Sequence, residues 1–302
     1  MKKQILALAI ASLAGGAFAQ AAAPAQSTID KVKASGIVTM GVRESSGALS
    51  FTLGDGKFAG YHVEVCSRIV AALEKQVGRK VETKLQAVTS QNRIPLLQNG
   101  TVDIECGSTT NNATRAKDVS FLNTVYMEQV RIAVKTKSGI TGIAQLNAKN
   151  VATTTGTTSV QLLRKHERAT GIDFKEVFGK DHADSFLLLE TDRADAFVMD
   201  ASILIGNIVN SKSPADYRVV GEPLSLEPIG IMIRKDDPAF LKLGNDVIAD
   251  LVKSGEIAKI YDKWFTQPIP PKNVNVNMPA TPDTKAAWAS LNSKPAEDFV
   301  KK

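Results

Sequence analysis

Hydrophobic and polar positions follow two alternating patterns along this chain. Short apolar runs rich in β-branched residues predict buried strands, and they occur at 37–42, 81–88, 102–106, 151–154, 174–178 and 196–200. Between these runs, apolar residues recur at helical spacing. One example is the segment from Val63 to Leu73, which Gly78 terminates. Strands that alternate with helices predict an α/β fold with a parallel sheet.

Two further extended stretches, 129–135 and 230–234, flank the middle of the chain. We interpret them as strands that cross between two lobes. The 302 residues are enough for two domains of roughly 100–200 residues each, and one large domain is the alternative. We predict that lobe 1 consists of two pieces, 27–131 and 228–278, and that lobe 2 is the block 132–227. A C-terminal tail with one short helix follows at 279–302.

The first residues have the three parts of a secretory signal. Lys2 and Lys3 precede an apolar stretch at 5–14, and Ala17-Phe18-Ala19 resembles a cleavage site. The alternative is a membrane anchor, but the apolar stretch is far shorter than the roughly 20 residues that span a bilayer. We therefore expect cleavage near Ala19, a short unstructured lead at 20–26 and a soluble mature protein.

Charge and cysteine content narrow the possible classes. The formal net charge is +6, and the basic residues are interspersed with acidic ones, so we do not expect nucleic-acid binding. A mildly positive surface favours a small anionic ligand. Cys66 and Cys106 are either a disulfide or two buried thiols, because spacing alone does not place two Cα atoms within about 4.4–6.8 Å. Two cysteines and three scattered histidines are too few for a metal site.

Polar clusters follow the predicted strands at 43–46, 90–93, 107–112 with Arg115, and 155–159. In open α/β sheets, ligands bind at the carboxyl ends of the strands, where helix N-termini face the opening. The ordinary interpretation of each cluster is a helix cap or a solvated arginine. Three of the four clusters, however, carry an arginine, whose planar fork matches a carboxylate. Together they indicate a ligand with more than one anionic group.

Four longer strings make a specific resemblance. They are TSQNRIPLLQNGT at 89–101, ECGSTTNN at 105–112, DKWF at 262–265 and PIPPKN at 268–273. Over nearly the whole mature chain, the sequence resembles the glutamate/aspartate periplasmic binding proteins of ABC importers. The resemblance implies a type II two-lobe periplasmic-binding-protein fold that closes on its ligand at a two-strand hinge. It also implies a periplasmic monomer without cofactor, which delivers L-glutamate or L-aspartate to membrane permease subunits.

The resemblance also implies roles for individual residues. The ligand α-carboxylate would be held by residues of both lobes: Ser108, Thr110, Arg115 and Thr158. Thr155 is also expected among the ligand-binding residues. Asp200 would pair with the α-ammonium, since a desolvated ammonium is costly when unpaired. The side-chain carboxylate would be held by a second group: Arg43, Ser90, Arg93 and His182.

The charges of these residues favour an acidic ligand. Three arginines against Asp200 complement a dicarboxylic amino acid, whereas a cationic ligand would require a carboxylate in place of Arg43 or Arg93. One departure from the family is visible at 47–51, where the expected Pro-Phe-Ser-Tyr pattern is missing. This segment therefore does not predict the aromatic wall that the family would have beside the ligand. The preference between glutamate and aspartate stays open.

Two other functions compete with this one. Cyclohexadienyl dehydratases are periplasmic enzymes that resemble these binding proteins, and their chemistry needs a general acid in the cleft. Glu44, Glu64 and Glu105 are the carboxylates near predicted strand ends in lobe 1, and we interpret each as surface or scaffold. The third class, the sensor domain of a receptor, would need a transmembrane segment after Lys302.

Overall fold

The computed structural model describes residues 26–299. The predicted signal peptide at 1–19, its cleavage site and nearly all of the predicted lead lie outside these residues. Within the described part of the chain, helices reach neither the length nor the apolar character needed to cross a membrane.

A sheet with the strand order β10-β9-β11-β8-β12-β6-β1-β5 runs through the molecule, and β7 pairs with β12. We call β1, β5, β6 and β7 the first sheet half, and β9, β10 and β11 the second sheet half. Neighbouring strands are parallel within both (β1 with β5 and β6, β9 with β10 and β11). The predicted α/β class is confirmed. The strands of the main sheet are β1 (Ile37–Val42), β5 (Glu82–Ala87), β6 (Ile104–Thr110), β7 (Val119–Phe121), β8 (Tyr126–Lys135), β9 (Asn150–Thr154), β10 (Lys175–Gly179), β11 (Ala196–Asp200) and β12 (Tyr217–Arg234).

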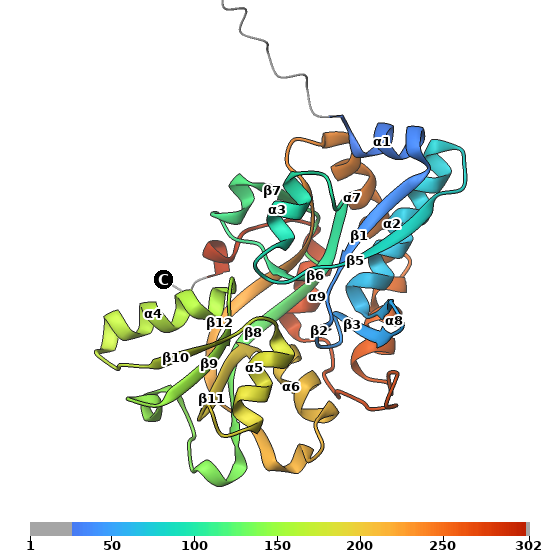
Figure 1. Ribbon diagram of the computed structural model, residues 1–302. Coiled ribbons are helices and arrows are strands. Elements are labelled where there is room, and N and C mark those ends of the chain that lie inside the picture. The colour runs from blue at the N-terminus through green and yellow to red at the C-terminus, as the bar shows by residue number, and fades with distance from the viewer. Residues whose placement is uncertain (1–25, 300–302) are drawn as a thin grey trace, which may run out of the picture.

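Two strands join the halves. The strand β8 pairs with β11 of the second half, and β12 pairs with β6 of the first half, while β8 and β12 pair with each other. Figure 1 shows them running side by side through the middle of the molecule. Both are longer than the predicted stretches 129–135 and 230–234, because their pairing continues into each half.

Helices flank the sheet on both sides of this junction (Figure 1). A small sheet of β2 (Ser45–Ser46), β3 (Ser50–Gly54) and β4 (Lys57–Ala59) lies beside the first half. The helices are α1 (Thr28–Ser35), α2 (Tyr61–Val77), α3 (Arg93–Gln98), α4 (Thr158–Thr170), α5 (His182–Glu190), α6 (Ala201–Asn210), α7 (Pro238–Lys253), α8 (Glu256–Phe265) and α9 (Pro282–Ser290). Short 3₁₀ turns occur at Arg115–Lys117, Thr136–Ser138, Ile143–Leu146, Pro214–Asp216 and Ala296–Phe299.

The core of the first half is aromatic and cross-linked. Tyr261 and Phe265 stack at 4.4 Å between ring centroids, and Trp288 of α9 packs edge-on against Tyr261. A disulfide joins Cys66 of α2 to Cys106 of β6, with their Cα atoms 6.3 Å apart. The sequence left this pairing open, and the structure forms it. The disulfide attaches to β6, the strand that carries part of the candidate site.

The core of the second half is mostly aliphatic, with a few phenylalanines, and is divided by its sheet. One face gathers residues such as Val151, Leu163 and Val198. The other gathers residues such as Phe186 and Leu204. Each face is covered by its own helices, so the strand ends of this half are held in place from both sides.

Candidate functional site

A small cavity lies where the two sheet halves face each other. Its lining residues come from both halves, and they are Ser90, Arg93, Ser108, Thr110, Arg115, Thr157, Thr158, His182, Met199 and Asp200. Most of the residues singled out from the sequence are therefore brought together. The exceptions are Arg43 and Thr155, which do not line the cavity.

The strand ends explain this convergence. Ser90 follows β5, and Thr158 begins α4 just after β9. His182 begins α5 after β10, and Asp200 is the last residue of β11. Because parallel strands end at the same edge of a sheet, each half presents its polar residues toward the other. The strand β6 differs from the prediction. It continues to Thr110, since Thr110 pairs with Ile229 of β12, so Ser108 and Thr110 lie within a strand rather than in the loop after it.

Arg43 is fully buried and reaches the cavity through its neighbours. Its Nη2 donates to Ser90 Oγ at 3.0 Å, to Asp181 Oδ1 at 2.6 Å and to His182 Nε2 at 3.1 Å. Asp181 also accepts from Ser45 Oγ at 2.7 Å. Asp181 and His182 belong to the second half, so Arg43 connects the two halves at this end of the cavity.

Several N–H groups at this end have no acceptor. Within residues 26–299, Arg43 Nε, Arg43 Nη1 and Arg93 Nε are buried without a hydrogen-bond partner. Burial, followed by the nearby charges of Arg115 and Arg43, lowers the pKa of Arg93. Of these two arginines, Arg93 lines the cavity. A ligand carboxylate is an acceptor-only group, so beside Arg93 it would supply an acceptor and neutralise part of the repulsion.

His182 acts as a neutral orienting group in this arrangement. A guanidinium only donates, so His182 Nε2 accepts from Arg43, and Nδ1–H then donates to Thr154 Oγ1 at 2.9 Å. Burial and the adjacent Arg43 charge lower the pKa of His182 to about 3. His182 thus adds no positive charge of its own near neutral pH.

The other end of the cavity is built differently. Arg115 Nη1 donates to Thr110 O at 2.9 Å, and Nη2 donates to Gly156 O across the cavity at 3.2 Å. Asp200 is buried here beside two more buried carboxylates. Burial raises the pKa of Asp200 well above its usual range, and the charges of Glu128 and Glu227 raise it further. A ligand ammonium would supply the cation that this group of carboxylates needs.

The charge count made from the sequence was incomplete. The structure places four further carboxylates around the three arginines and Asp200: Glu105, Glu128, Asp181 and Glu227. Glu128 and Glu227 lie on the crossing strands, where no local pattern marks them, whereas Asp181 directly precedes His182. Burial raises the pKa of Glu128 to about 7.

Three other predicted features have a definite place. Thr155 donates its hydroxyl to Gly179 O at 3.4 Å, away from the cavity. Glu105 is buried and accepts from Thr109 at 3.1 Å, whereas Glu44 is exposed. Among the described residues that line the cavity, none is a tyrosine, phenylalanine or tryptophan, in line with the missing aromatic pattern at 47–51.

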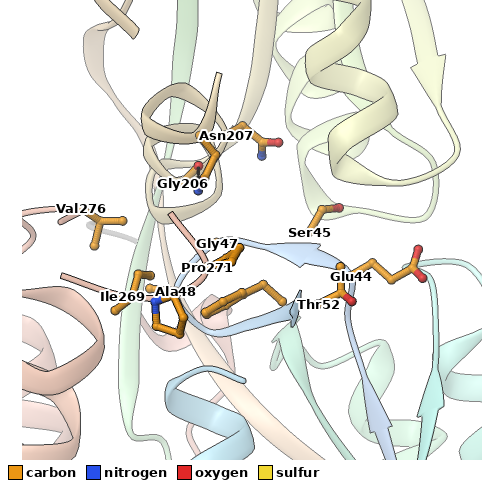
Figure 2. Close-up of a pocket in the computed structure, with 13 residues that line it drawn as sticks. Glu44, Ser45, Gly47, Ala48, Thr52, Gly206, Asn207, Ile269, Pro271 and Val276 are labelled. Atoms are coloured by element: carbon orange, nitrogen blue, oxygen red, sulfur yellow. Dashed lines mark hydrogen bonds between the residues drawn. The ribbon is translucent and has the colours of Figure 1, made fainter. Parts of the chain in front are cut away.

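A second pocket, separate from this cavity, lies where the loop at Gly47 meets α6 and the C-terminal segment near Pro271. Figure 2 shows Gly206 of α6 close to Gly47. A Cβ atom on Gly206 would lie 2.8 Å from Gly47 Cα. The two halves therefore touch backbone to backbone at this point, which only glycines permit.

Comparison with known proteins places these observations in a family. The family model of bacterial extracellular solute-binding proteins, family 3, matches residues 38–267. A glutamate/aspartate import solute-binding protein of Escherichia coli is 44% identical and covers 95% of this chain and 96% of its own. An L-glutamate/L-aspartate-binding protein of Pseudomonas aeruginosa is also 44% identical, covering 90% of this chain and 91% of its own.

Solved structures share the same architecture. An ancestral amino-acid-binding protein, described as a precursor of cyclohexadienyl dehydratase, superposes with a TM-score of 0.68 at 26% identity. The match covers 79% of this chain and 99% of that one. The predicted periplasmic-binding-protein fold is confirmed.

Proposed function

The chain belongs to the bacterial extracellular solute-binding proteins of family 3, and we propose that it captures L-glutamate or L-aspartate for an ABC importer. Of two relatives at 44% identity, one is a glutamate/aspartate import solute-binding protein and the other an L-glutamate/L-aspartate-binding protein. The protein is a binding protein and not an enzyme, so the dehydratase alternative is set aside. One observation in the site carries the proposal: the cavity is lined at one end by Arg93, whose buried Nε–H has no acceptor among the described residues, and at the other end by Asp200.

The positions of these groups support a role for each. Arg115 holds the α-carboxylate, and Asp200 pairs with the α-ammonium. Arg93 and Ser90 hold the side-chain carboxylate, and Arg43 contributes to the same end through Ser90 and His182. Ser108, Thr110 and Thr158 complete the cavity wall. Arg43 is already paired with Asp181. A neutral amide in place of the side-chain carboxylate would leave Arg93, which lines the cavity, without that counter-charge, so an acid is preferred over its amide.

The wider setting follows from the same function. Lobe 1 (27–131 and 228–278) and lobe 2 (132–227) close on the ligand by bending at β8 and β12. The tail at 279–302 follows lobe 1, and its helix α9 places Trp288 in the core of the first half. The protein is exported with its signal peptide cleaved near Ala19, acts as a monomer in the periplasm and delivers its ligand to the permease subunits. The paired strands β8 and β12 support the hinge, since they join the two sheet halves.

Titration calorimetry of the mature protein tests the function. We expect saturable binding of glutamate and aspartate, with much weaker binding of glutamine and lysine. Asp200→Asn removes the partner of the ammonium and should abolish measurable binding, whereas Asp216→Asn alters an exposed aspartate and should not. Binding of glutamine alone, or equal binding by the Asp200 variant, would overturn the proposal.

A further inference from the structure

Glu227 joins the two sheet halves beside the cavity. It lies on β12 and is only 3% exposed. Its Oε2 accepts from Thr110 Oγ1 at 2.6 Å and from Thr158 Oγ1 at 2.9 Å. Thr110 ends β6 in the first half, and Thr158 begins α4 in the second. One buried carboxylate thus holds a hydroxyl from each side of the cleft.

Glu227 lies behind these two threonines as seen from the cavity. Thr110 and Thr158 line the small cavity, and they also line a larger groove on its other side. Glu227 lines the groove but not the cavity. Its second oxygen, Oε1, accepts from Ser225 Oγ at 2.9 Å, which fixes the carboxylate in place. Glu227 therefore acts on the cavity through the threonines.

The number of protons decides what the threonines offer a ligand. A hydroxyl has one proton to donate and two lone pairs. Thr110 and Thr158 both donate to Glu227, so their hydroxyls have only lone pairs left to face the cavity. A hydroxyl in this state accepts hydrogen bonds from a ligand and repels another acceptor. The two hydroxyls are therefore suited to the ligand ammonium, and not to the α-carboxylate that the family resemblance assigned to them.

We propose that Glu227 is a positioning residue, which ties Thr110 to Thr158 across the closed cleft and commits both hydroxyl protons away from the cavity. The inference rests on the proposed function and goes beyond it. Glu227 lies outside the cavity, but it makes the site selective. A ligand with a hydrogen-bond acceptor in place of the amino acid's ammonium group is rejected. Because Glu227 lies on β12, its two hydrogen bonds also link this crossing strand to both sides of the closed cleft.

The test compares glutamate with 2-oxoglutarate, in which an acceptor-only carbonyl replaces the ammonium-bearing carbon. In Glu227→Ala, both hydroxyls are free to rotate and donate to the carbonyl oxygen. We expect the Kd for glutamate to rise ~10-fold because the bond across the cleft is lost. The ratio of the Kd for 2-oxoglutarate to that for glutamate should fall by about tenfold. Competition calorimetry measures both constants in folded protein.

Three further variants separate the proposed role from other effects of the substitution. Glu227→Gln keeps the size of the side chain but accepts through one oxygen only, so it should lower the ratio by a smaller factor, and it carries the test if the alanine variant does not fold. Glu222→Ala removes an exposed carboxylate from the same strand and should leave the ratio unchanged. In a background of Thr110→Val and Thr158→Val, Glu227→Ala should no longer alter the ratio.

A purely structural role for Glu227 makes a different prediction. General loosening of the cleft would weaken both ligands by the same factor, so an unchanged ratio in both Glu227 variants would overturn the inference. Failure of the wild-type protein to bind glutamate would instead refute the proposed function, and the two failures are therefore distinguishable.

Discussion

The two ends of the cavity use arginine in different ways. At the Arg115 end, the guanidinium is bonded to two backbone carbonyls, one on each side of the cleft, and carboxylates surround it. At the Arg43 and Arg93 end, three N–H groups have no acceptor among the described residues. The guanidinium of Arg115 is thus bonded within the protein, and the carboxylates near it are short of a cation, whereas the Arg43 and Arg93 end is short of an acceptor.

This difference separates two tasks of the site. The Arg115 end, together with Asp200, suits the groups that every amino acid shares, and its internal bonds keep it in shape. The Arg93 end suits one additional carboxylate, because an unpaired buried donor is costly until an acceptor arrives. Affinity for amino acids in general and selectivity for acidic ones should therefore depend on different residues.

The largest expected effect comes from Arg115→Ala. Truncating one member of a buried charged pair costs about 3–5 kcal/mol, so the Kd should rise ~100-fold to ~5,000-fold for glutamate and aspartate alike. Calorimetry measures this, with Arg168→Ala on the exposed side of α4 as the control. Unchanged glutamate affinity would remove Arg115 from the site.

Arg93→Gln should act on selectivity. It replaces a cation with a neutral donor, so glutamate binding should weaken by about 2–3 kcal/mol while glutamine binding stays the same or improves. The measured quantity is the ratio of the two Kd values. If glutamate and glutamine lost affinity equally, the two ends would not be separate in function.

A third prediction concerns acid stability. Burial lowers the pKa of His62 to about 4, although the hydrogen bond to Gly107 O opposes the shift. The folded pKa is below the usual 6.5, so the stabilisation is complete above pH 6.5 and is lost as the pH falls toward 4. The free energy of unfolding should drop by about 2 kcal/mol for this histidine between pH 7 and pH 5.

His62→Gln tests this prediction, because the variant should flatten that part of the pH profile in chemical unfolding. His62 lies behind β6 and does not line the cavity, so glutamate affinity at pH 7 should stay near that of the wild type. A variant with an unaltered pH profile would show that the pKa of His62 is the same in the folded and the unfolded protein.

The smallest effect is expected from Gly206→Ala, which should weaken the binding of acidic and other amino acids by the same factor. The added methyl group meets the Gly47 backbone and hinders closure, so all ligands should bind about 1 kcal/mol more weakly. The same change favours α6 as a helix, so thermal stability without ligand should not fall. Gly142→Ala adds a methyl group in open space and serves as the control, and a loss confined to glutamate would contradict the prediction.

Local signals in the sequence were sufficient for the elements and for part of the site. The alternation of periods predicted β11 at Ala196–Asp200, and the terminal position of Asp200 marked it as a candidate. Ser90, Arg93, Arg115 and Thr158 were found because each follows a strand or begins a helix. Periodicity and strand-end position depend on neighbouring residues, so a sequence displays them directly.

Only the tertiary structure decided how the charges are paired. Asp181 lies 138 residues from Arg43, and Glu227 lies 117 residues from Thr110. The pairing of Cys66 with Cys106 was open for the same reason. Such contacts depend on how the two sheet halves meet at β8 and β12, which no local pattern encodes. The sequence by itself determined which polar groups lie at the strand ends. The contact between the two sheet halves determined which of these groups form hydrogen bonds and ion pairs with one another.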